Sequence, residues 1–147
     1  RARYLIDGKP ETIWHSQFNP SLAKPPHELI IDLKKVRKVS GVQYLARQDS
    51  GWNGTFGETE FFLSLDKDAF PGKPFSITFS KKKKPQTFKF AKPIDARFVK
   101  VRILSEVNGK EWGSASEVGI LLSSQKKRNR TVTLLWGGRA RGVVILW

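Results

Sequence analysis

The sequence predicts an all-β protein built as an antiparallel β-sandwich. Many short apolar runs alternate with turn-forming residues at intervals of about eight to twelve residues, and no segment has a helical period. At 147 residues, the chain is long enough to bury one hydrophobic core without help from a metal or a disulfide. It contains no Cys, so no disulfide framework forms and the redox compartment is left open.

The expected strands follow in chain order. Residues 29–33 form a short apolar strand, and a basic turn separates it from a strand at 39–47. There Val42, Tyr44 and Ala46 alternate imperfectly with Gln43, Leu45 and Arg47. The next segment, 49–57, is rich in Gly, Asn and Ser and cannot continue the strand, so Arg47 is expected at a strand end that faces a loop. Further strands are predicted at 60–65, 75–79, 87–90, 97–104 and 116–123.

The net charge of +14 invites a nucleic-acid interpretation, because Lys and Arg patches bind phosphate backbones by counterion release. Its distribution weakens that interpretation. Residues 124–147 contain six basic residues and no acid, which leaves 21 basic against 13 acidic residues in 1–123. Another four charges form the single run Lys81 to Lys84, which precedes Pro85 and is interpreted as a solvated hairpin tip.

The chain ends carry no targeting signal that can be recognised. No apolar run approaches 18 residues, and no charged-then-apolar segment opens the chain, so we expect neither a membrane span nor a secretion signal. The first residue is Arg, so the chain is expected to be an excised module or a processed fragment.

Residues 5–16 place a turn, several oxygen donors, a Trp and a His close together in sequence. Asp7-Gly8 is a turn signal, and the Thr12 hydroxyl can join its own carbonyl and the Asp7 carboxylate around one point. Hard oxygen donors on a tight loop suit a Ca²⁺-like ion, although the same residues also fit an Asx-turn that only caps the loop. Trp14 is interpreted as the core residue on which this loop packs.

An ordered set of motifs extends this pattern along the chain. Asp7-Gly8, Thr12 and Trp14-His15-Ser16 are followed by Ile31-Asp32-Leu33, Arg47-Gln48-Asp49, Asn53-Gly54 and Ser114-Ala115-Ser116-Glu117. In this set the chain resembles the discoidin (coagulation factor 5/8 type C) domains, and most closely the bacterial family 32 carbohydrate-binding modules, from about residue 5 to residue 122. The resemblance implies a galactose-binding-like jelly roll with a structural calcium and a sugar pocket at one end.

The resemblance also implies a set of metal ligands. Asp7 and Glu117 would supply carboxylates, Thr12 both its hydroxyl and its carbonyl, and Tyr4, Lys9 and Ser116 their backbone carbonyls. Carboxylates with neutral oxygens fit Ca²⁺ better than Zn²⁺, which prefers nitrogen and sulfur. The family usually has Asp or Asn at the Lys9 position, so the Lys9 ammonium should weaken the site. Its role would be structural, because it ties the N-terminal loop to the last core strand.

The expected ligand residues also come from the resemblance. His15, Arg47 and Asn53 occupy positions that bind sugar hydroxyls in the family, Trp112 lies in a late loop that often supplies an aromatic platform, and Trp52 is a second candidate platform. A guanidinium, an amide and an imidazole match hydroxyls that both donate and accept, and a Trp face covers the apolar side of a sugar ring. The alternatives are an Arg47–Asp49 surface pair, a His15 that caps a strand and a Trp112 in the core.

These observations favour a non-catalytic carbohydrate-binding module that recognises a terminal sugar, of galactose type or an amino sugar. The chain has two His, no Cys and no sequence signature of a hydrolase, metalloprotease or nucleotide-binding enzyme. The expected partners are a glycan and a parent glycan-active or surface protein; the module is expected to be monomeric, with no specific nucleic-acid partner, and extracellular, periplasmic or at the cell surface.

Two alternative functions use other residues. A discoidin module that binds anionic phospholipid would need apolar residues at exposed loop tips, for which Phe56, Phe70 and Trp52 are candidates. Sulfated polysaccharide or nucleic acid could instead bind the basic surface, and such binding would fade steeply with salt.

The predicted domain covers residues 1–123, with the family's usual first strand expected to be missing. The tail, 124–147, is predicted to be a basic linker followed by a β-hairpin, in which runs 131–136 and 142–147 are joined by 137–141. One hypothesis places this tail at the vacated sheet edge; the alternative is that it begins a neighbouring domain or has no role in the fold.

Overall fold

The computed structural model describes residues 1–123 and 132–135 and is almost entirely β-structure. A short 3₁₀ helix, η1 (Ala2–Leu5), precedes the strands. The strands are β1 (Trp14–His15), β2 (His27–Leu45), β3 (Glu58–Ser64), β4 (Phe75–Thr78), β5 (Gln86–Ile103), β6 (Ser114–Ala115), β7 (Glu117–Ser123) and β8 (Val132–Leu135). Within the described part of the chain, no helix is long and apolar enough to cross a membrane.

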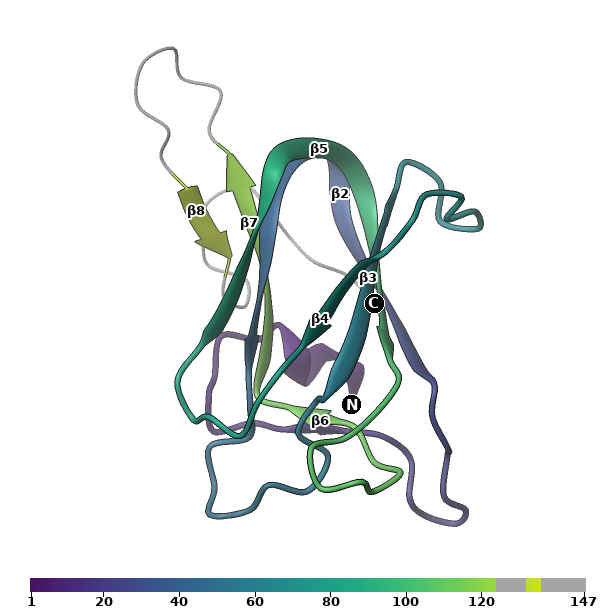
Figure 1. Cartoon of the computed structure of the whole chain (residues 1–147), viewed down its shortest axis with the longest axis vertical. Coiled ribbons are helices and arrows are strands. Elements are labelled where there is room, and N and C mark those ends of the chain that lie inside the picture. Colours follow the sequence, from purple (N-terminus) through teal and green to yellow (C-terminus); the bar gives the residue numbers. More distant parts are fainter. Residues whose placement is uncertain (124–131, 136–147) are drawn as a thin grey trace.

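The sandwich arises because two long strands arch over the core together. Strands β2 and β5 pair along most of their length, in the sheet order β4-β3-β5-β2-β7-β8. The last part of β5 lies between β3 and the first part of β2, whereas the last part of β2 lies between the first part of β5 and β7. Figure 1 shows the arch of β5 over β2, with the legs of the arch on either side of the interior. All pairings in this sheet are antiparallel, which confirms the predicted fold class.

A local bend in β2 produces the arch. Lys34 has φ of 71°, a left-handed conformation that is uncommon for a residue with a side chain. The Asp32 carboxylate accepts a hydrogen bond from the Lys34 backbone N–H at 2.7 Å and pairs with Arg97 of β5 at 3.0 Å. The register shifts between Asp32 and Arg37, so the extra residues of β2 turn the strand without ending it.

The core joins both layers through aromatic side chains. Tyr44 of β2 is fully buried, stacks on Phe56 at 4.4 Å between ring centroids and contacts Phe79 at 4.8 Å. Phe79 in turn meets Phe61 of β3 edge-on. Fully burying one such ring stabilises the fold by about 1.5–3 kcal/mol, so this cluster contributes a large part of the hydrophobic free energy. Burial raises the pKa of Tyr44, whose hydroxyl is held by the Ser114 carbonyl and the Phe56 N–H.

The predicted strands are present, but two predicted breaks are wrong. The run 29–33 and residues 39–45 belong to one strand, β2, and the run 87–90 and residues 97–103 belong to one strand, β5; the predicted runs to 47 and 104 extend slightly beyond the observed strand ends. The basic residues at 34–38 were predicted to form a turn between strands, yet the Asp32 contacts allow the pairing to resume at Arg37.

The tail contributes one described strand. Strand β8 lies within the predicted run 131–136 and pairs with the outer side of β7, at the edge of the sheet. The run 142–147 and the basic segment 124–130 lie outside the described residues.

Candidate functional site

A two-stranded ribbon organises the end of the sandwich opposite the arch. Strand β1 pairs with β6, so that Trp14 lies opposite Ala115 and His15 opposite Ser114. Trp14 is buried and packs edge-on against Phe56, which confirms its predicted place in the core. The pairing orients successive side chains to opposite faces, so that Trp14 points inward and His15 lies at the half-exposed surface.

The loop after β2 is attached to the same ribbon. Ser114 donates from its backbone N–H to the Gly54 carbonyl at 2.6 Å and from its hydroxyl to the Asn53 carbonyl at 2.6 Å. Gly54 has φ of 82°, and a Cβ there would lie 2.7 Å from the Ser114 nitrogen, so the close approach requires glycine. Ser114 therefore lies opposite His15 and also holds Asn53, which brings these two predicted ligand residues to one surface.

Arg47 reaches the same loop through its guanidinium. Its Nη1 donates to the Asn53 carbonyl at 3.1 Å, while Nε and Nη2 donate to the two carboxylate oxygens of Asp49. The side-chain hydrogen bond between them raises the pKa of Arg47 and lowers the pKa of Asp49. The surface pair with Asp49 is therefore formed, yet these contacts use three of the five guanidinium N–H groups and leave two donors.

Two aromatic rings flank His15. The Trp112 ring is half-buried and lies 6.2 Å from the imidazole between centroids, and the Phe18 ring meets the imidazole edge-on at 5.1 Å. The side chain of Phe18 is 63% exposed. His15 Nδ1 lies 2.8 Å from the Ser16 carbonyl, which can only accept, so Nδ1 carries the proton and Nε2 of the neutral ring is an acceptor.

Trp52, the second predicted platform, is covered differently. The ammonium of Lys83 lies 3.8 Å from the centre of its ring and also donates to the carbonyls of Arg47 and Gly51 at 2.8 and 2.7 Å. Burial lowers the pKa of Lys83. The interpretation of Lys81 to Lys84 as a solvated tip is thus wrong for Lys83, which fixes the 47–52 loop and occupies one side of Trp52.

A buried carboxylate that sequence reasoning missed connects the loops of this end. Glu106 is 4% exposed and accepts hydrogen bonds from the Gly54 N–H at 3.2 Å, the Asn108 N–H at 2.6 Å and the Lys110 N–H at 2.9 Å. The Asn108 amide adds a further bond at 2.9 Å. Glu106 therefore joins the loop of Asn53 to the loop that leads to Trp112.

The predicted metal-binding residues lie close together beneath η1. The Thr12 hydroxyl is 2.9 Å from both Asp7 carboxylate oxygens and 2.9 Å from the Lys9 carbonyl, and Lys9 N–H donates to Asp7 at 2.9 Å. Ser116 donates its hydroxyl to the Pro10 carbonyl at 2.7 Å, which links this loop to the start of β7. Tyr4 lies within η1, which contacts β7.

Glu117 is the residue that suggests a cation most directly. Its side chain is fully buried, and neither carboxylate oxygen has a hydrogen bond of good geometry among the described residues, although the Gly8 and Lys9 backbone N–H groups and Asp7 lie close to it. Burial, reinforced by the negative charge of Asp7, raises the pKa of Glu117 to about 8. A buried carboxylate beside a second carboxylate and neutral oxygens fits a calcium ion, although no three His, Cys, Asp or Glu side chains of the described residues gather in a way that could hold a metal by themselves.

Phe56, one of the three apolar residues proposed for membrane insertion, is not placed for that role. Phe56 is fully buried in the core, because its ring stacks on Tyr44. Phe70 is half-buried beside the ammonium of Lys100, at 4.8 Å from its ring. The prediction that Phe56 forms an exposed spike is therefore wrong.

The family model of the F5/8 type C domain matches residues 1–118. The chain belongs to the F5/8 type C domain family. As an F5/8 type C domain, it is homologous to carbohydrate-binding modules of known structure.

Two solved modules from Clostridium perfringens show this relationship. The module CpGH89CBM32-5, in complex with GalNAc-β-1,3-galactose, is 29% identical, with a TM-score of 0.71 over 80% of each chain. The family 32 carbohydrate-binding module of NanJ, in complex with galactose, is 30% identical, with a TM-score of 0.66 over 81% of this chain and 82% of that one.

Curated relatives are much longer than this domain. A galactose oxidase from Gibberella zeae is 31% identical over 138 residues, and a sialidase from Micromonospora viridifaciens is 32% identical over 121 residues. These alignments cover 90% and 82% of this chain but 19% and 18% of the relatives. The chain therefore spans less than a fifth of the length of these two relatives.

Proposed function

We propose that this F5/8 type C domain is a non-catalytic carbohydrate-binding module that holds a terminal sugar, of galactose type or an amino sugar, at the ribbon end. The observation that carries the proposal is the junction at Ser114, which lies opposite His15 and binds the loop of Asn53 and Arg47. The similarity to modules solved with galactose and with GalNAc-β-1,3-galactose supports this ligand class.

The chemistry of the site matches sugar hydroxyls. His15 Nε2 offers an acceptor, Arg47 has two N–H donors outside its contacts with Asp49 and Asn53, and the exposed Asn53 amide offers both. Vicinal hydroxyls both donate and accept, so such a set can bind them in pairs. The rings of Trp112 and Phe18 border His15 and would cover the apolar face of the sugar ring.

A calcium ion bound by Asp7, Thr12 and Glu117, with carbonyls of Tyr4, Lys9 and Ser116, would have a structural role. It would neutralise the buried Glu117 carboxylate and fix the N-terminal loop against β7. The ion would hold no part of the sugar, since His15 and Arg47 belong to other loops. The domain would act as a monomeric targeting module of a larger glycan-active or surface protein outside the cytoplasm, as its long relatives suggest.

Titration with galactose, N-acetylgalactosamine and N-acetylglucosamine tests the proposal, with Arg47→Ala as the decisive variant. The variant should lose binding of the preferred sugar by at least about tenfold, because a charge-assisted hydrogen bond to a hydroxyl contributes about 1.5–3 kcal/mol. Arg97→Ala is the matched control, since it removes an equivalent Arg–Asp pair at the arch.

The two variants separate a binding role from a general charge effect. Arg97→Ala should bind sugar like the wild type. Equal binding by Arg47→Ala and the wild type, with both folded, would contradict the placement of the sugar at this end.

A further inference from the structure

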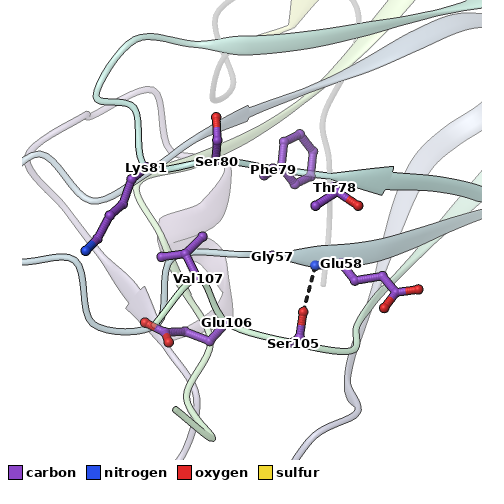
Figure 2. Close-up of a pocket in the computed structure, with 9 residues that line it drawn as sticks. All are labelled: Gly57, Glu58, Thr78, Phe79, Ser80, Lys81, Ser105, Glu106 and Val107. Atoms are coloured by element: carbon purple, nitrogen blue, oxygen red, sulfur yellow. Dashed lines mark hydrogen bonds between the residues drawn. The ribbon is translucent and has the colours of Figure 1, made fainter. Parts of the chain in front are cut away.

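A cleft of about 490 Å³ lies beside the candidate sugar site. It opens between the start of β3, the end of β4 and the segment that follows β5, and Figure 2 shows its lining. The lining residues are Gly57, Glu58, Thr78, Phe79, Ser80, Lys81, Ser105, Glu106 and Val107. The ring of Phe79 is nearly fully buried in the core beneath the cleft, and most of the other side chains that line the cleft are polar. Its volume lies within the range of about 300–1,000 Å³ that is usual for small-molecule sites.

The cleft presents donors and acceptors that the fold does not use. In the described part of the chain, neither Glu58 nor Lys81 forms an ion pair, and both side chains are exposed. The Ser105 oxygen accepts from the Glu58 N–H at 2.8 Å, which leaves its O–H available to donate. Figure 2 shows the Glu58 and Lys81 side chains at opposite ends of the cleft, with Ser105 between them, so the lining suits an extended ligand whose groups both donate and accept.

The charges of the cleft limit the ligand class. Glu58 and the buried Glu106 both line it, so a phosphate or sulfate near Lys81 would also meet two carboxylates. A cation would find one free carboxylate, because Glu106 already accepts four hydrogen bonds. An uncharged polyhydroxyl ligand avoids both conflicts.

Two contacts connect the cleft to the sugar-binding loop. The ammonium of Lys81 lies 6.0 Å from the Trp52 ring, and Glu106 accepts the Gly54 N–H at 3.2 Å. Figure 2 shows the side chains of Lys81 and Glu106 extending to the same side of the cleft. The loop of Trp52, Asn53 and Gly54 therefore forms the boundary between the cleft and the surface that holds His15 and Arg47.

We propose that this cleft is a second sugar subsite, which binds the next residues of an oligosaccharide whose terminal sugar is held at His15, Arg47 and Asn53. The inference rests on the proposed function, because it extends the same ligand along the molecule. Glu58, Lys81 and Ser105 bind hydroxyls of the second residue, and Val107 faces its apolar C–H groups. The domain then recognises a glycan end of at least two residues.

The test compares monosaccharide with oligosaccharide affinity by titration calorimetry. The probes are galactose and galactose-terminated trisaccharides with 1,3 and 1,4 linkages. The wild-type domain should bind one linkage at least about tenfold more tightly than galactose. Glu58→Ala and Lys81→Ala should each remove most of that gain while galactose affinity stays as in the wild type. Lys84→Ala is the matched control, because Lys84 is exposed in the same basic run but does not line the cleft.

The outcomes separate this inference from the proposed function. Absence of binding to galactose, to both amino sugars and to the trisaccharides would overturn both. Galactose binding with no gain for either trisaccharide would overturn the subsite alone. A gain that survives Glu58→Ala and Lys81→Ala, or falls equally in Lys84→Ala, would also overturn it. Melting temperatures verify that each variant is folded.

Discussion

Replacement of Glu106 by Ala should both destabilise the domain and weaken sugar binding. The Glu106 carboxylate accepts four hydrogen bonds from two loops, and the bond from the Gly54 N–H is buried. An unpaired buried N–H costs about 1–3 kcal/mol, and exchanging the three part-buried bonds for water costs about 1 kcal/mol more. The free energy of unfolding should therefore fall by about 2–4 kcal/mol.

Urea and thermal unfolding measure this loss. For a domain of this size the melting temperature should drop by roughly 6–16 °C. Galactose affinity should fall as well, because Asn53 and Trp112 lose their common support. Glu106→Gln should recover part of both losses. The amide oxygen of Gln can accept hydrogen bonds from one loop, whereas its NH₂ group cannot accept from the N–H of the other loop.

Glu111→Ala is the matched control for this prediction. Glu111 is exposed and its side chain pairs with exposed Lys24 at 3.5 Å, so its removal should change stability by less than about 1 kcal/mol. If Glu106→Ala unfolds at the same temperature as Glu111→Ala and binds galactose equally well, the assignment of Glu106 as a positioning residue is refuted.

Two further predictions concern the cation and the aromatic rings. Calcium at a hundredfold excess over Kd should stabilise the domain by about 3 kcal/mol, seen as a higher melting temperature than in EDTA. Asp7→Asn and Glu117→Gln should abolish that shift. Glu117→Gln should melt no lower than the wild type in EDTA, because a pKa of about 8 keeps the metal-free carboxyl mostly protonated near neutral pH, and Gln is likewise uncharged. An unchanged melting temperature of the wild type on adding EDTA and then Ca²⁺ would argue against the site. Trp112→Ala should weaken sugar binding by about 1–3 kcal/mol. Phe18→Ala should weaken binding with no change in stability, since Phe18 is 63% exposed. If the Trp112 variant binds glycan like the wild type, the placement of the pocket beside Trp112 is contradicted.

The strands could be predicted because their pattern is local. Val42 and Tyr44 recur with the period of two that is typical of a strand, although Gln43 and Leu45 beside them are buried as well, and the Gly- and Asn-rich segment after Arg47 does not continue the strand. The continuity of β2 through its basic bend could not be predicted, because it depends on Asp32 meeting Arg97, which is 65 residues away in sequence. In the sequence alone, the basic segment 34–38 after Asp32 therefore cannot be distinguished from a turn between two strands.

The candidate site also contains residues that the sequence could identify and residues that it could not. The order of motifs identified His15, Arg47 and Asn53, but it contained no information on Glu106, whose contact with Gly54 spans 52 residues. The local sequence Glu106-Val107-Asn108-Gly109 indicates a turn and a carboxylate that could accept from it, which is half of the observed arrangement. Phe18 follows His15 by three residues, yet its exposure depends on the fold of the Asn19-Pro20 loop beyond it.

The arch of β2 also places its bend far from the proposed sugar site, so that insertions at the bend should leave sugar binding intact. One end of β2 begins at His27, whose Nε2 bonds the Glu111 carbonyl near Trp112, and the other end leads into Arg47. Val36, at the bend, is 54% exposed and lies about 30 Å from either end measured along the strand. A peptide tag or a reporter domain inserted beside Val36 would therefore project from the arch, at the end of the molecule opposite the proposed sugar site. The same position could be used to attach the domain to a surface in a defined orientation.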